Sequence, residues 1–535
     1  MTISTLTPPT EAPLGTQPAA PPGIYYLTQD TRAIAETLTG SCTDLSPVQR
    51  QDVRAVADEL WEEIERSIRQ LSRNVMTFTE ETIQQGLTTT LEEEIGSSDS
   101  VALCLDKYFL PSEKMSAAPL RGLQISRMAD GSKAPRQGSQ PIDAQLDRLS
   151  QEINGRPVVV VDDGIFTGGS IRYVLGLLQE RRIQIKSIVV FMGNPAVRQV
   201  NGIDVRRVRS LDNCIDWIDA RDLTILGGRP EKLSSRLSVA SSRPYIAPFS
   251  DGRPASIEPR SLRKTSGEIL GAQESFFREL ETIIGKKITL RDSLRAGFPL
   301  PVCEDPALRT VGLSTPLREI ALRARQTLDT QAMPSGDIIL DMDGTLYSLD
   351  GPGNGFVGST LEREVNRNAV AFIMKREPCT EQNALKIFTE GSRDFIGLSA
   401  FLSRRYSITR DSYYDEVWGT IDVTAIVQRS KAIAVVRELQ ASGKVLRLLT
   451  SAPSAWAQKV LEYLGVQNCF ASITTGEQFG QKAEVFETYR NSPDVQNMLS
   501  VGDQFHSDIQ PAIDAGMQTL QVSFGRSVTY LLSLQ

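Results

Sequence analysis

Two short runs of apolar residues in the chain end abruptly in aspartates. The first is "VVVV" at 158–161, followed by Asp162 and Asp163, and the second is "IIL" at 338–340, followed by Asp341. Apolar runs of this length, rich in β-branched residues, are typical of strands that are buried on both faces. The sequence therefore predicts two buried strands, each of which ends in acidic side chains.

The pattern around the first strand predicts a strand–helix–strand unit. Residues 171–182, "IRYVLGLLQERR", have apolar positions at helical spacing, and 185–193, "IKSIVVFMG", form another apolar strand. A second pattern of this kind begins at about Met333 and continues to the end of the chain. Strands that alternate with helices favour parallel sheets, so we expect the α/β class with two doubly wound parallel-sheet domains.

We expect four parts along the chain. Its 535 residues are too many for a single core, since a domain usually holds roughly 100–200 residues. The parts are a disordered leader at 1–23, a first α/β domain at 24–230, a segment of uncertain fold at 231–330 and a second α/β domain at 333–535. The leader is rich in proline and threonine and lacks the basic and apolar regions of a signal peptide.

Composition narrows the class of protein. The formal net charge of −7 argues against a broad nucleic-acid-binding surface, and no stretch approaches the roughly 20 apolar residues that cross a bilayer. The six cysteines lack CxxC spacing, which fits reduced thiols rather than a disulfide framework or a zinc site. We therefore expect a cytoplasmic protein that acts on small molecules, without nucleic-acid or membrane partners. A homodimer is compatible with the sequence.

The segment after the first strand has the composition of a phosphate-binding loop. The loop consists of Thr167, Gly168, Gly169 and Ser170. Backbone N–H groups, two hydroxyls and the dipole of the following helix would face an anion there. Asp162 and Asp163 would repel that anion unless a sugar separates them, with the carboxylates accepting hydrogen bonds from ribose hydroxyls. A Mg²⁺ ion that bridges ribose and pyrophosphate oxygens would neutralise more of the charge.

Residues 158–170, "VVVVDDGIFTGGS", resemble the phosphoribosyl pyrophosphate (PRPP) binding signature of type I phosphoribosyltransferases. They match it at every defined position: four apolar residues, two acids, three variable positions and TGGS. The resemblance implies that Asp162 and Asp163 bind the ribose hydroxyls and that the TGGS loop binds the 5-phosphate. The alternatives are a generic strand-to-helix turn, or a family member that binds PRPP or a nucleotide as a regulator without catalysis.

Two further segments are candidates for the PRPP site by the same resemblance. The loop at 128–145, rich in glycine, serine, proline and basic residues, occupies the place of the family's flexible loop. Lys133 and Arg136 are its candidates to meet the pyrophosphate. "CLDKYF" stands where the family has its pyrophosphate loop, with Asp106 and Lys107 as the candidate residues, although this stretch departs from the common forms of that loop.

The second acid-ended strand indicates a different chemistry. Asp341 and Asp343 stand two apart at a strand end, so both can face one metal ion, and hard oxygen ligands suit Mg²⁺. A metal-neutralised aspartate can attack a phosphorus centre while the neighbouring carboxyl protonates the leaving alcohol. "DMDGT" resembles the first motif of the haloacid dehalogenase-like (HAD) superfamily, which implies Asp341 as nucleophile and Asp343 as acid/base.

Three further motifs follow in the order of that superfamily. "VLRLLTS" contains Thr450, which fits the hydroxyl that binds the phosphoryl group, and "GQKAEVF" contains Lys482, which fits the stabilising cation. "VGDQFHSDI" supplies Asp503 and Asp508 in a GDxxxxD arrangement, which would complete the metal site with both aspartates of the first motif. A chance match to the superfamily is a poor explanation for four motifs in this order.

The long gap between the first two motifs is strongly helical and indicates a helical cap at about 352–430. "DMDGTLY" and "EGSRDFIGL" are similar to pyrimidine 5′-nucleotidase-like members of the superfamily. Cap residues usually select the substrate, so Arg393 is a candidate contact, and a solvated helix residue is the alternative. His506, the only histidine, stands inside the fourth motif, where a loop residue is a simpler interpretation than a catalytic one.

Together the two domains suggest one hypothesis for the whole chain. The first would make a ribosyl 5-phosphate compound from PRPP and a base-like acceptor, and the second would release its phosphate. Such fused pairs resemble predicted modules of bacterial tellurite-resistance and stress gene clusters, by analogy only. The alternatives are a PRPP- or nucleotide-sensing domain that regulates a HAD phosphatase, and a scaffold with two inactive sites. The sequence leaves open the acceptor, the monoester and whether the two sites act in succession.

Overall fold

A computed structural model describes most of the chain. The described residues are 23–40, 42, 45–96, 99–106, 109, 120–128, 131–231, 241–303, 308, 311–330, 333, 335–351, 355–393, 398–427, 430–522 and 527–534. The leader expected at 1–23 lies outside them except for Gly23, and Lys107 also lies outside them.

The chain forms two compact units, which are treated separately below. The first unit comprises Met1–Asp30, Ile68–Gln124 and Pro141–Asp219. The second unit comprises Thr31–Ser67, Ile125–Gln140 and Ala220–Gln535.

Two sheets make up the first unit. Its strands are β1 (Ile24–Thr28), β2 (Val75–Phe78), β3 (Val101–Cys104), β4 (Leu120–Gly122), β7 (Val158–Ile165), β8 (Ile185–Gly193), β9 (Gln199–Val200), β10 (Ile203–Ser210) and β11 (Cys214–Asp219). The larger sheet has the order β4-β3-β7-β8-β10-β9, and only β9 runs antiparallel to its neighbour. The smaller sheet, β11-β1-β2, is parallel throughout.

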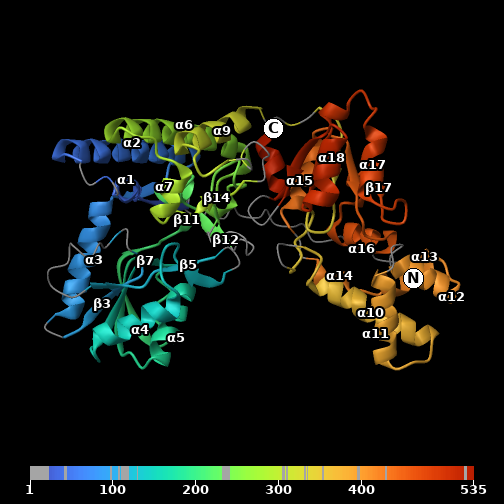
Figure 1. Ribbon diagram of the computed structural model, residues 1–535, viewed down its shortest axis with the longest axis horizontal. Helices are drawn as coiled ribbons and strands as arrows, with labels where there is room; N and C mark the ends of the chain where they lie inside the picture. Colours follow the sequence, from blue (N-terminus) through green and yellow to red (C-terminus); the bar gives the residue numbers. More distant parts are fainter. Residues whose placement is uncertain are drawn as a thin grey trace, which may run out of the picture. The chain divides into compact units, whose positions relative to one another are not determined.

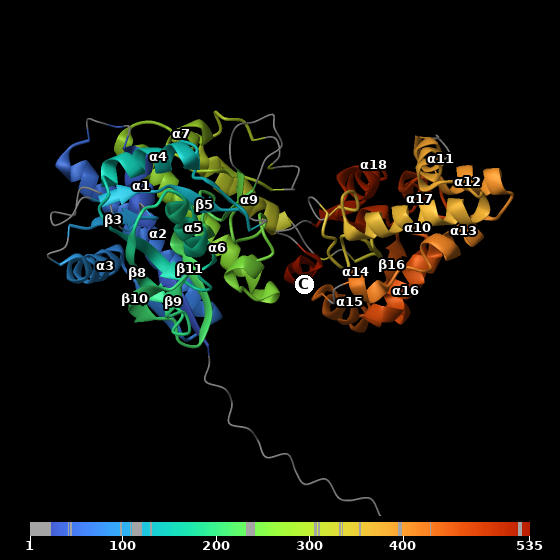
Figure 2. The ribbon, with the colours of Figure 1, turned by 90° about the horizontal axis from the view of Figure 1, so that it is seen from below.

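Helices cover both faces of β7 in the first unit. They are α3 (Glu80–Ile95), α4 (Ile142–Ile153) and α5 (Gly169–Glu180). Helix α3 packs on β7, β8 and β10, while Figures 1 and 2 show α4 and α5 on the other side of the sheet. Val159 and Val161 enter a core cluster with residues of α3 and of the smaller sheet, such as Leu87 and Tyr26. This double coverage explains why the apolar run before the first aspartates is continuous rather than alternating.

The first part of the second unit is mainly helical. Its elements are α1 (Thr31–Thr39), α2 (Pro47–Leu71), α6 (Pro259–Ile284), α7 (Leu290–Arg295), α9 (Leu317–Thr330), the hairpin of β5 (Ile125–Arg127) and β6 (Lys133–Pro135), and a sheet of β12 (Arg229–Glu231), β13 (Ser241–Arg243) and β14 (Leu300–Pro301). Helix α6 packs on α9, and it is joined to α2 by hydrogen bonds from Gln49 to Ile283 and from Ser67 to Glu268, so the three helices lie side by side (Figure 1).

The rest of the second unit is built on a second parallel sheet. Its strands are β15 (Ile338–Leu340), β16 (Leu446–Leu449), β17 (Ser472–Thr474), β18 (Leu499–Gly502) and β19 (Gln518–Gln521), in the order β17-β16-β15-β18-β19. The helices that alternate with these strands are α15 (Ala432–Ala441), α16 (Ser454–Leu464), α17 (Lys482–Tyr489) and α18 (Gln510–Asp514).

A group of helices fills the chain between β15 and β16. They are α10 (Thr360–Arg376), α11 (Glu381–Arg393), α12 (Leu398–Tyr406), α13 (Arg410–Val417) and α14 (Val423–Ile426), drawn in orange tones in Figure 1. The described part of this segment contains no strand.

The predicted α/β class with mostly parallel sheets is confirmed. The six cysteines are all free thiols, and two of them, Cys104 and Cys303, are buried. None of the described helices combines the length and the apolar character that crossing a membrane would need.

Candidate active sites

The HAD-like motif residues gather at the carboxyl edge of the second parallel sheet. Asp341 follows β15, Thr450 follows the adjacent β16, and Asp503 follows β18 on the other side. The Asp341 backbone N–H donates to the Val501 carbonyl at 2.9 Å and ties two of these strand ends together. The carboxyl ends of parallel strands share one edge, so motifs from distant parts of the chain meet there.

Lys482 lies between two carboxylates at this edge. It begins α17, and its ammonium donates to Asp341 Oδ1 and to Asp508 Oδ1, both at 2.6 Å. The Lys482 side chain is only 4% exposed, so both ion pairs are buried. Burial alone would lower the pKa of the Lys482 ammonium, but the two carboxylates outweigh burial and raise it. Lys482 therefore stays charged and is a fixed cation beside Asp341.

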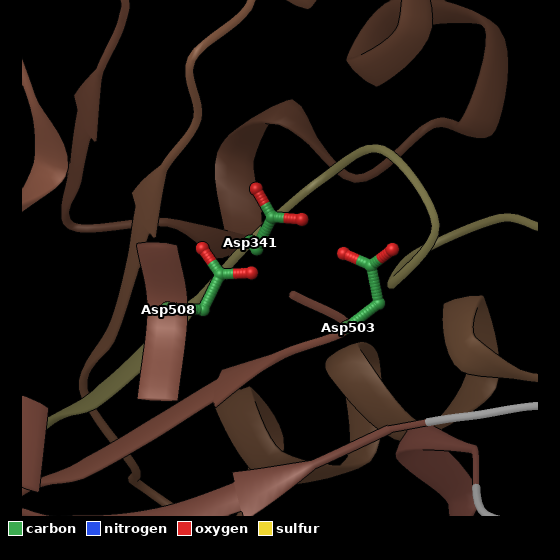
Figure 3. Close-up of side chains that lie close together, drawn as sticks. All are labelled: Asp341, Asp503 and Asp508. Carbon is green, nitrogen blue, oxygen red and sulfur yellow. The ribbon is translucent and has the colours of Figure 1, made fainter. Parts of the chain in front are cut away.

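Asp341, Asp503 and Asp508 form a cluster that could hold a metal ion. One carboxylate oxygen from each residue can be chosen so that the three oxygens lie within 4.8 Å of one another, and Figure 3 shows the three side chains. The buried Oδ1 atom of Asp503 has no hydrogen-bond partner among the described residues, and burial together with Asp508 raises the pKa of Asp503 to about 7. Of the three carboxylates, those of Asp341 and Asp508 pair with the Lys482 ammonium. A divalent cation would compensate the remaining charge, and these oxygen donors fit Mg²⁺.

Asp343 stands apart from this cluster. Its carboxylate accepts a short hydrogen bond from the Tyr347 hydroxyl, one from Trp456 Nε1 at 3.2 Å and one from Thr450 Oγ1 at 3.5 Å. Burial raises the pKa of Asp343, and these hydrogen bonds, which act to lower it, do not compensate. The structure thus brings together three of the four aspartates expected at the metal and holds the carboxylate of Asp343 in a separate set of hydrogen bonds.

Tyr347 and Trp456 are site residues that the sequence analysis missed. Both are fully buried, and Trp456 Nε1 also lies 3.3 Å from the Tyr347 hydroxyl. Tyr347 stands four residues after Asp343, within the same motif, so this spacing could have identified it. Trp456 carries no local signal because it reaches Asp343 from α16, a separate helix.

Two weaker candidates lie on the surface. His506 is exposed on the short π-helix Phe505–Ile509, where its ring contacts Phe505 edge-on, and Arg393 is exposed at the end of α11. Both therefore differ from the buried side chains around Asp341.

The PRPP-like stretch spans the end of β7 and the start of α5. The strand continues through Ile165, so Asp162 and Asp163 belong to the strand, whereas the sequence predicted that the loop begins at Asp162. Gly168 precedes the helix with a φ of +75°, a conformation that favours glycine. The loop residues lie close to solvent: Thr167 and Gly169 are exposed, and Ser170 is half-buried. An exposed helix N-terminus of this kind can bind a phosphate group.

Several aspartates converge on the end of β7. Asp162 and Asp163 are half-buried on β7, Asp106 is buried after the adjacent β3, and Asp219 ends β11. Burial, followed by the carboxylates of Asp162, Asp219 and Asp106, raises the pKa of Asp163 well above its usual value. Within the described part of the chain, no ion pair compensates Asp163. Asp163 differs in this respect from Asp341, which pairs with Lys482.

The other predicted PRPP contacts are Lys107, Lys133 and Arg136. Lys107 lies outside the described residues. Lys133 on β6 and Arg136 belong to the second unit, and the Lys133 ammonium donates to the Gly131 carbonyl at 3.0 Å.

The sequence analysis also missed three residues beside the β7 cluster. Trp217 Nε1 donates to Thr28 Oγ1 at 3.3 Å, and the Thr28 hydroxyl donates to Asp219 Oδ1 in a short hydrogen bond. Thr28 and Asp219 are opposite each other in the parallel pair of β1 and β11. No local pattern could have connected them with residues 158–170, because only the tertiary fold brings these strands together.

Comparisons with known proteins agree with both assignments. Residues 112–221 match the family model of the phosphoribosyl transferase domain, and residues 338–516 match that of the haloacid dehalogenase-like hydrolase. A comparison with curated proteins found no significant match.

Solved structures similar to this chain include three of the HAD type. A HAD phosphatase from Thermococcus onnurineus has 16% identity and a TM-score of 0.28, covering 37% of this chain and 95% of that one. A HAD family enzyme from Bacteroides thetaiotaomicron, solved as a magnesium complex, has 16% identity and a TM-score of 0.24, covering 36% and 94%. A haloacid dehalogenase-like hydrolase from Xanthomonas campestris has 13% identity and a TM-score of 0.25, covering 38% and 91%.

The two family models cover separate parts of the chain, and each contains one of the acid-ended strands. The protein is therefore an enzyme that contains a phosphoribosyl transferase domain followed by a haloacid dehalogenase-like hydrolase domain.

Proposed function

We propose that the protein is a bifunctional enzyme that acts on small molecules. Its first domain, assigned to 24–230, transfers phosphoribosyl from PRPP to a base-like acceptor. Its second domain, assigned to 333–535, hydrolyses a phosphate monoester, the nucleotide-like product of the first reaction. The observation that carries the hydrolase half is the buried contact of Lys482 with Asp341 and Asp508, which fixes a nucleophile beside a cation.

In the hydrolase, Asp341 is the nucleophile. Its carboxylate attacks the phosphorus atom of the monoester, and the bond between phosphorus and the leaving alcohol oxygen breaks. Asp343 gives a proton to that oxygen, so the alcohol leaves uncharged. Asp343 then takes a proton from the water that attacks the aspartyl phosphate, which releases inorganic phosphate and restores Asp341. Tyr347 and Trp456 support this role, because their hydrogen bonds fix the Asp343 carboxyl group.

The remaining motif residues bind the phosphoryl group and a metal ion. Lys482 offsets negative charge on the phosphoryl oxygens and on Asp341, and the Thr450 hydroxyl binds another phosphoryl oxygen. Asp341, Asp503 and Asp508 are the residues proposed to hold Mg²⁺. When bound, Mg²⁺ neutralises carboxylate charge and polarises the phosphoryl group.

In the transferase, the PRPP-like stretch holds the sugar phosphate. The N–H groups and hydroxyls of residues 167–170 bind the 5-phosphate, while Asp162 and Asp163 accept hydrogen bonds from the ribose hydroxyls. An acceptor nitrogen attacks C1 of the ribose as the bond from C1 to the pyrophosphate oxygen breaks. Pyrophosphate leaves, and the acceptor loses its proton to solvent. The exposed start of α5, next to the two aspartates, supports this arrangement.

Hydrolysis of p-nitrophenyl phosphate with added Mg²⁺ tests the second domain. The wild-type chain should hydrolyse it, and Asp341→Asn should not, whereas Asp162→Asn/Asp163→Asn should keep full activity. Activity that survives Asp341→Asn would remove Asp341 from the role of nucleophile. No hydrolysis by the wild type across monoester substrates would favour a scaffold with an inactive site.

Release of pyrophosphate from PRPP tests the first domain. A panel of purine, pyrimidine and related bases serves as acceptors, and Asp162→Asn/Asp163→Asn is the inactive control. We expect at least one acceptor to yield pyrophosphate with the wild type and none with the double variant. If no acceptor yields pyrophosphate but PRPP changes the hydrolase turnover, the domain is a sensor rather than a transferase.

A further inference from the structure

Gly164, the residue after Asp163, is in contact with the indole ring of Trp217. A Cβ atom at Gly164 would lie 2.0 Å from Trp217 Cη2 and 2.1 Å from Cζ3, well below the 3.0 Å that real Cβ contacts respect. Gly164 is not among the glycines with positive φ, so its backbone does not require glycine. Glycine is required because the Trp217 ring occupies the space that a Cβ atom would take. In this respect Gly164 differs from Gly168 in the same stretch, whose φ of +75° is the reason for glycine.

Trp217 also links this contact to an acidic side chain on β11. Its Nε1 atom donates to Thr28 Oγ1 at 3.3 Å, and the Thr28 hydroxyl donates to Asp219 Oδ1. Thr28 is 1% exposed, so this link is shielded from water. The indole is therefore held by a steric contact with β7 on one side and by a hydrogen bond to β1 on the other. Movement of the Trp217 ring would therefore disturb both its contact with Gly164 and its hydrogen bond to Thr28.

We propose that Trp217, seated against Gly164, is a positioning residue that holds Asp219 beside the PRPP-like stretch, and that Asp219 is a further carboxylate of the phosphoribosyl site. This proposal rests on the proposed transferase function. It adds residues of the smaller sheet to a site that the motif confines to β7 and α5. Asp219 would accept hydrogen bonds from PRPP or from water on its divalent cation.

The electrostatics of β7 agree with this geometry. Of the charges that raise the pKa of Asp163, Asp219 follows only Asp162 in size, ahead of Asp106. A carboxylate that acts on Asp163 in this way belongs to the same local cluster. A ligand that brings a cation or several hydrogen-bond donors would relieve the repulsion among all of them.

A packing role alone is the competing explanation, because Trp217 also packs against the core cluster of the first unit. In that case, its replacement would lower stability without changing how the folded protein binds PRPP. The two explanations differ at Gly164→Ala, which adds one methyl group and keeps Trp217. The matched control is Gly176→Ala on α5, where a Cβ atom would meet nothing within 4 Å.

The test is calorimetric titration of the full-length variants with PRPP and Mg²⁺. Calorimetric unfolding of each variant reports whether the first unit is folded, and hydrolysis of p-nitrophenyl phosphate reports that the second unit is intact. Gly164→Ala should bind PRPP at least about tenfold more weakly than Gly176→Ala, since one extra methyl group forces the ring to move. Trp217→Ala should also weaken binding. Gly164→Ala/Trp217→Ala should bind about as well as Trp217→Ala alone, because the methyl group then displaces no ring and its nearest neighbour is the Met192 carbonyl oxygen, at 3.0 Å.

Asp219→Asn tests the carboxylate itself. We expect weaker PRPP binding and a weaker dependence of that binding on Mg²⁺ concentration, which a purely structural role would not change. PRPP binding by Gly164→Ala within about twofold of Gly176→Ala, or by Asp219→Asn within about twofold of wild type, would overturn the proposal. Additive losses in the double variant would also overturn it. If the wild type itself does not bind PRPP, the proposed transferase function fails as well, so the two failures can be told apart.

Discussion

The ends of β7 and β15 both carry aspartates at the carboxyl edge of a parallel sheet, yet their charge is balanced differently. At β15 the chain supplies its own cation, because the buried Lys482 ammonium contacts Asp341 and Asp508 at 2.6 Å. At β7, burial and neighbouring carboxylates raise the pKa of Asp163, and no ion pair compensates it within the described residues. The β15 site thus contains a cation of its own before a substrate binds, whereas the described residues supply no ion pair to Asp163.

This difference fits the two chemistries proposed for the strands. A carboxylate that attacks phosphorus must be ionised and fixed in place, which a buried ammonium favours. A carboxylate that binds ribose needs only the hydrogen-bond donors of the sugar, which come with the ligand. Two strands with similar sequences, "VVVVDD" and "IILDMD", thus differ in how an aspartate at their end is compensated: Asp341 pairs with Lys482, whereas Asp163 has no ion pair within the described residues.

The largest expected effect is on the nucleophile. Asp341→Asn should lower phosphomonoester hydrolysis by about a thousandfold or more, because an amide cannot form the aspartyl phosphate. Pyrophosphate release from PRPP should be unchanged in the same preparation, since the transferase site is separate. A parallel loss of both activities would mean that the two strand ends do not work independently.

Removal of the built-in cation should destabilise the β15 site. Lys482→Met leaves the carboxylates of Asp341 and Asp508 without their ammonium, and breaking such buried pairs costs about 3–5 kcal/mol. Calorimetric unfolding of the full chain should show this loss in the transition that belongs to the second unit. The control is Lys386→Met, exposed on α11, which should change stability by less than about 0.5 kcal/mol. Equal effects of both variants would contradict the proposed charge balance at β15.

The metal should add stability at β15. Saturating Mg²⁺ should stabilise the second unit by about 1–3 kcal/mol through binding to the folded state, and chelation should remove that gain together with hydrolysis. In Asp503→Asn the gain should be much smaller, because one of the three carboxylates of the cluster is lost. Thermal unfolding with and without Mg²⁺ measures this gain in stability. An identical gain in the wild type and in Asp503→Asn would exclude Asp503 as a ligand.

The smallest expected effect is on stability at β7, where Asp163→Asn should stabilise the protein, whereas Lys482→Met at β15 should destabilise it. The pKa of Asp163 is raised in the folded protein, so the folded state holds the proton more tightly than the unfolded chain does. The stability of the first unit should therefore be highest below the usual pKa of an aspartate and should fall as the pH rises through the raised value. Asp163→Asn should remove this fall and stabilise the unit at neutral pH by about 1 kcal/mol.

Calorimetric unfolding between acid and neutral pH measures this effect. Asp204→Asn, exposed on β10 of the same unit, is the control and should keep the pH dependence of the wild type. A loss of stability in Asp163→Asn at neutral pH would show that the carboxylate is already compensated, and the contrast with β15 would then disappear.

The sequence predicted those parts of the fold and sites that depend on neighbouring residues. Continuous apolar runs predicted strands buried on both faces, and the glycines of the TGGS stretch predicted the turn into α5, where Gly168 has a positive φ. The aspartates and Lys482 were predicted because each stands in a short motif. All these signals lie within a few residues of each other along the chain.

Contacts made by the tertiary fold could not be predicted in the same way. Trp456 reaches Asp343 from another helix, and Trp217 reaches Gly164 from a strand of the smaller sheet. The sequence predicted Asp343 at the metal because it stands two residues from Asp341, but it did not predict the hydrogen bonds that the Asp343 carboxylate accepts from Tyr347 and Trp456. The end of β7 also depends on ladder hydrogen bonds with β8, which extend the strand beyond its apolar residues.

The most direct test of the account is mass spectrometry of the small molecules formed from PRPP and a cell extract by two proteins, the wild type and Asp341→Asn. The account predicts that Asp341→Asn accumulates a ribosyl 5-phosphate compound and that the wild type converts the same compound to its free ribosyl form. Formation of neither product, or the same free product from both proteins, would contradict the proposal that one strand end binds the sugar and the other removes its phosphate.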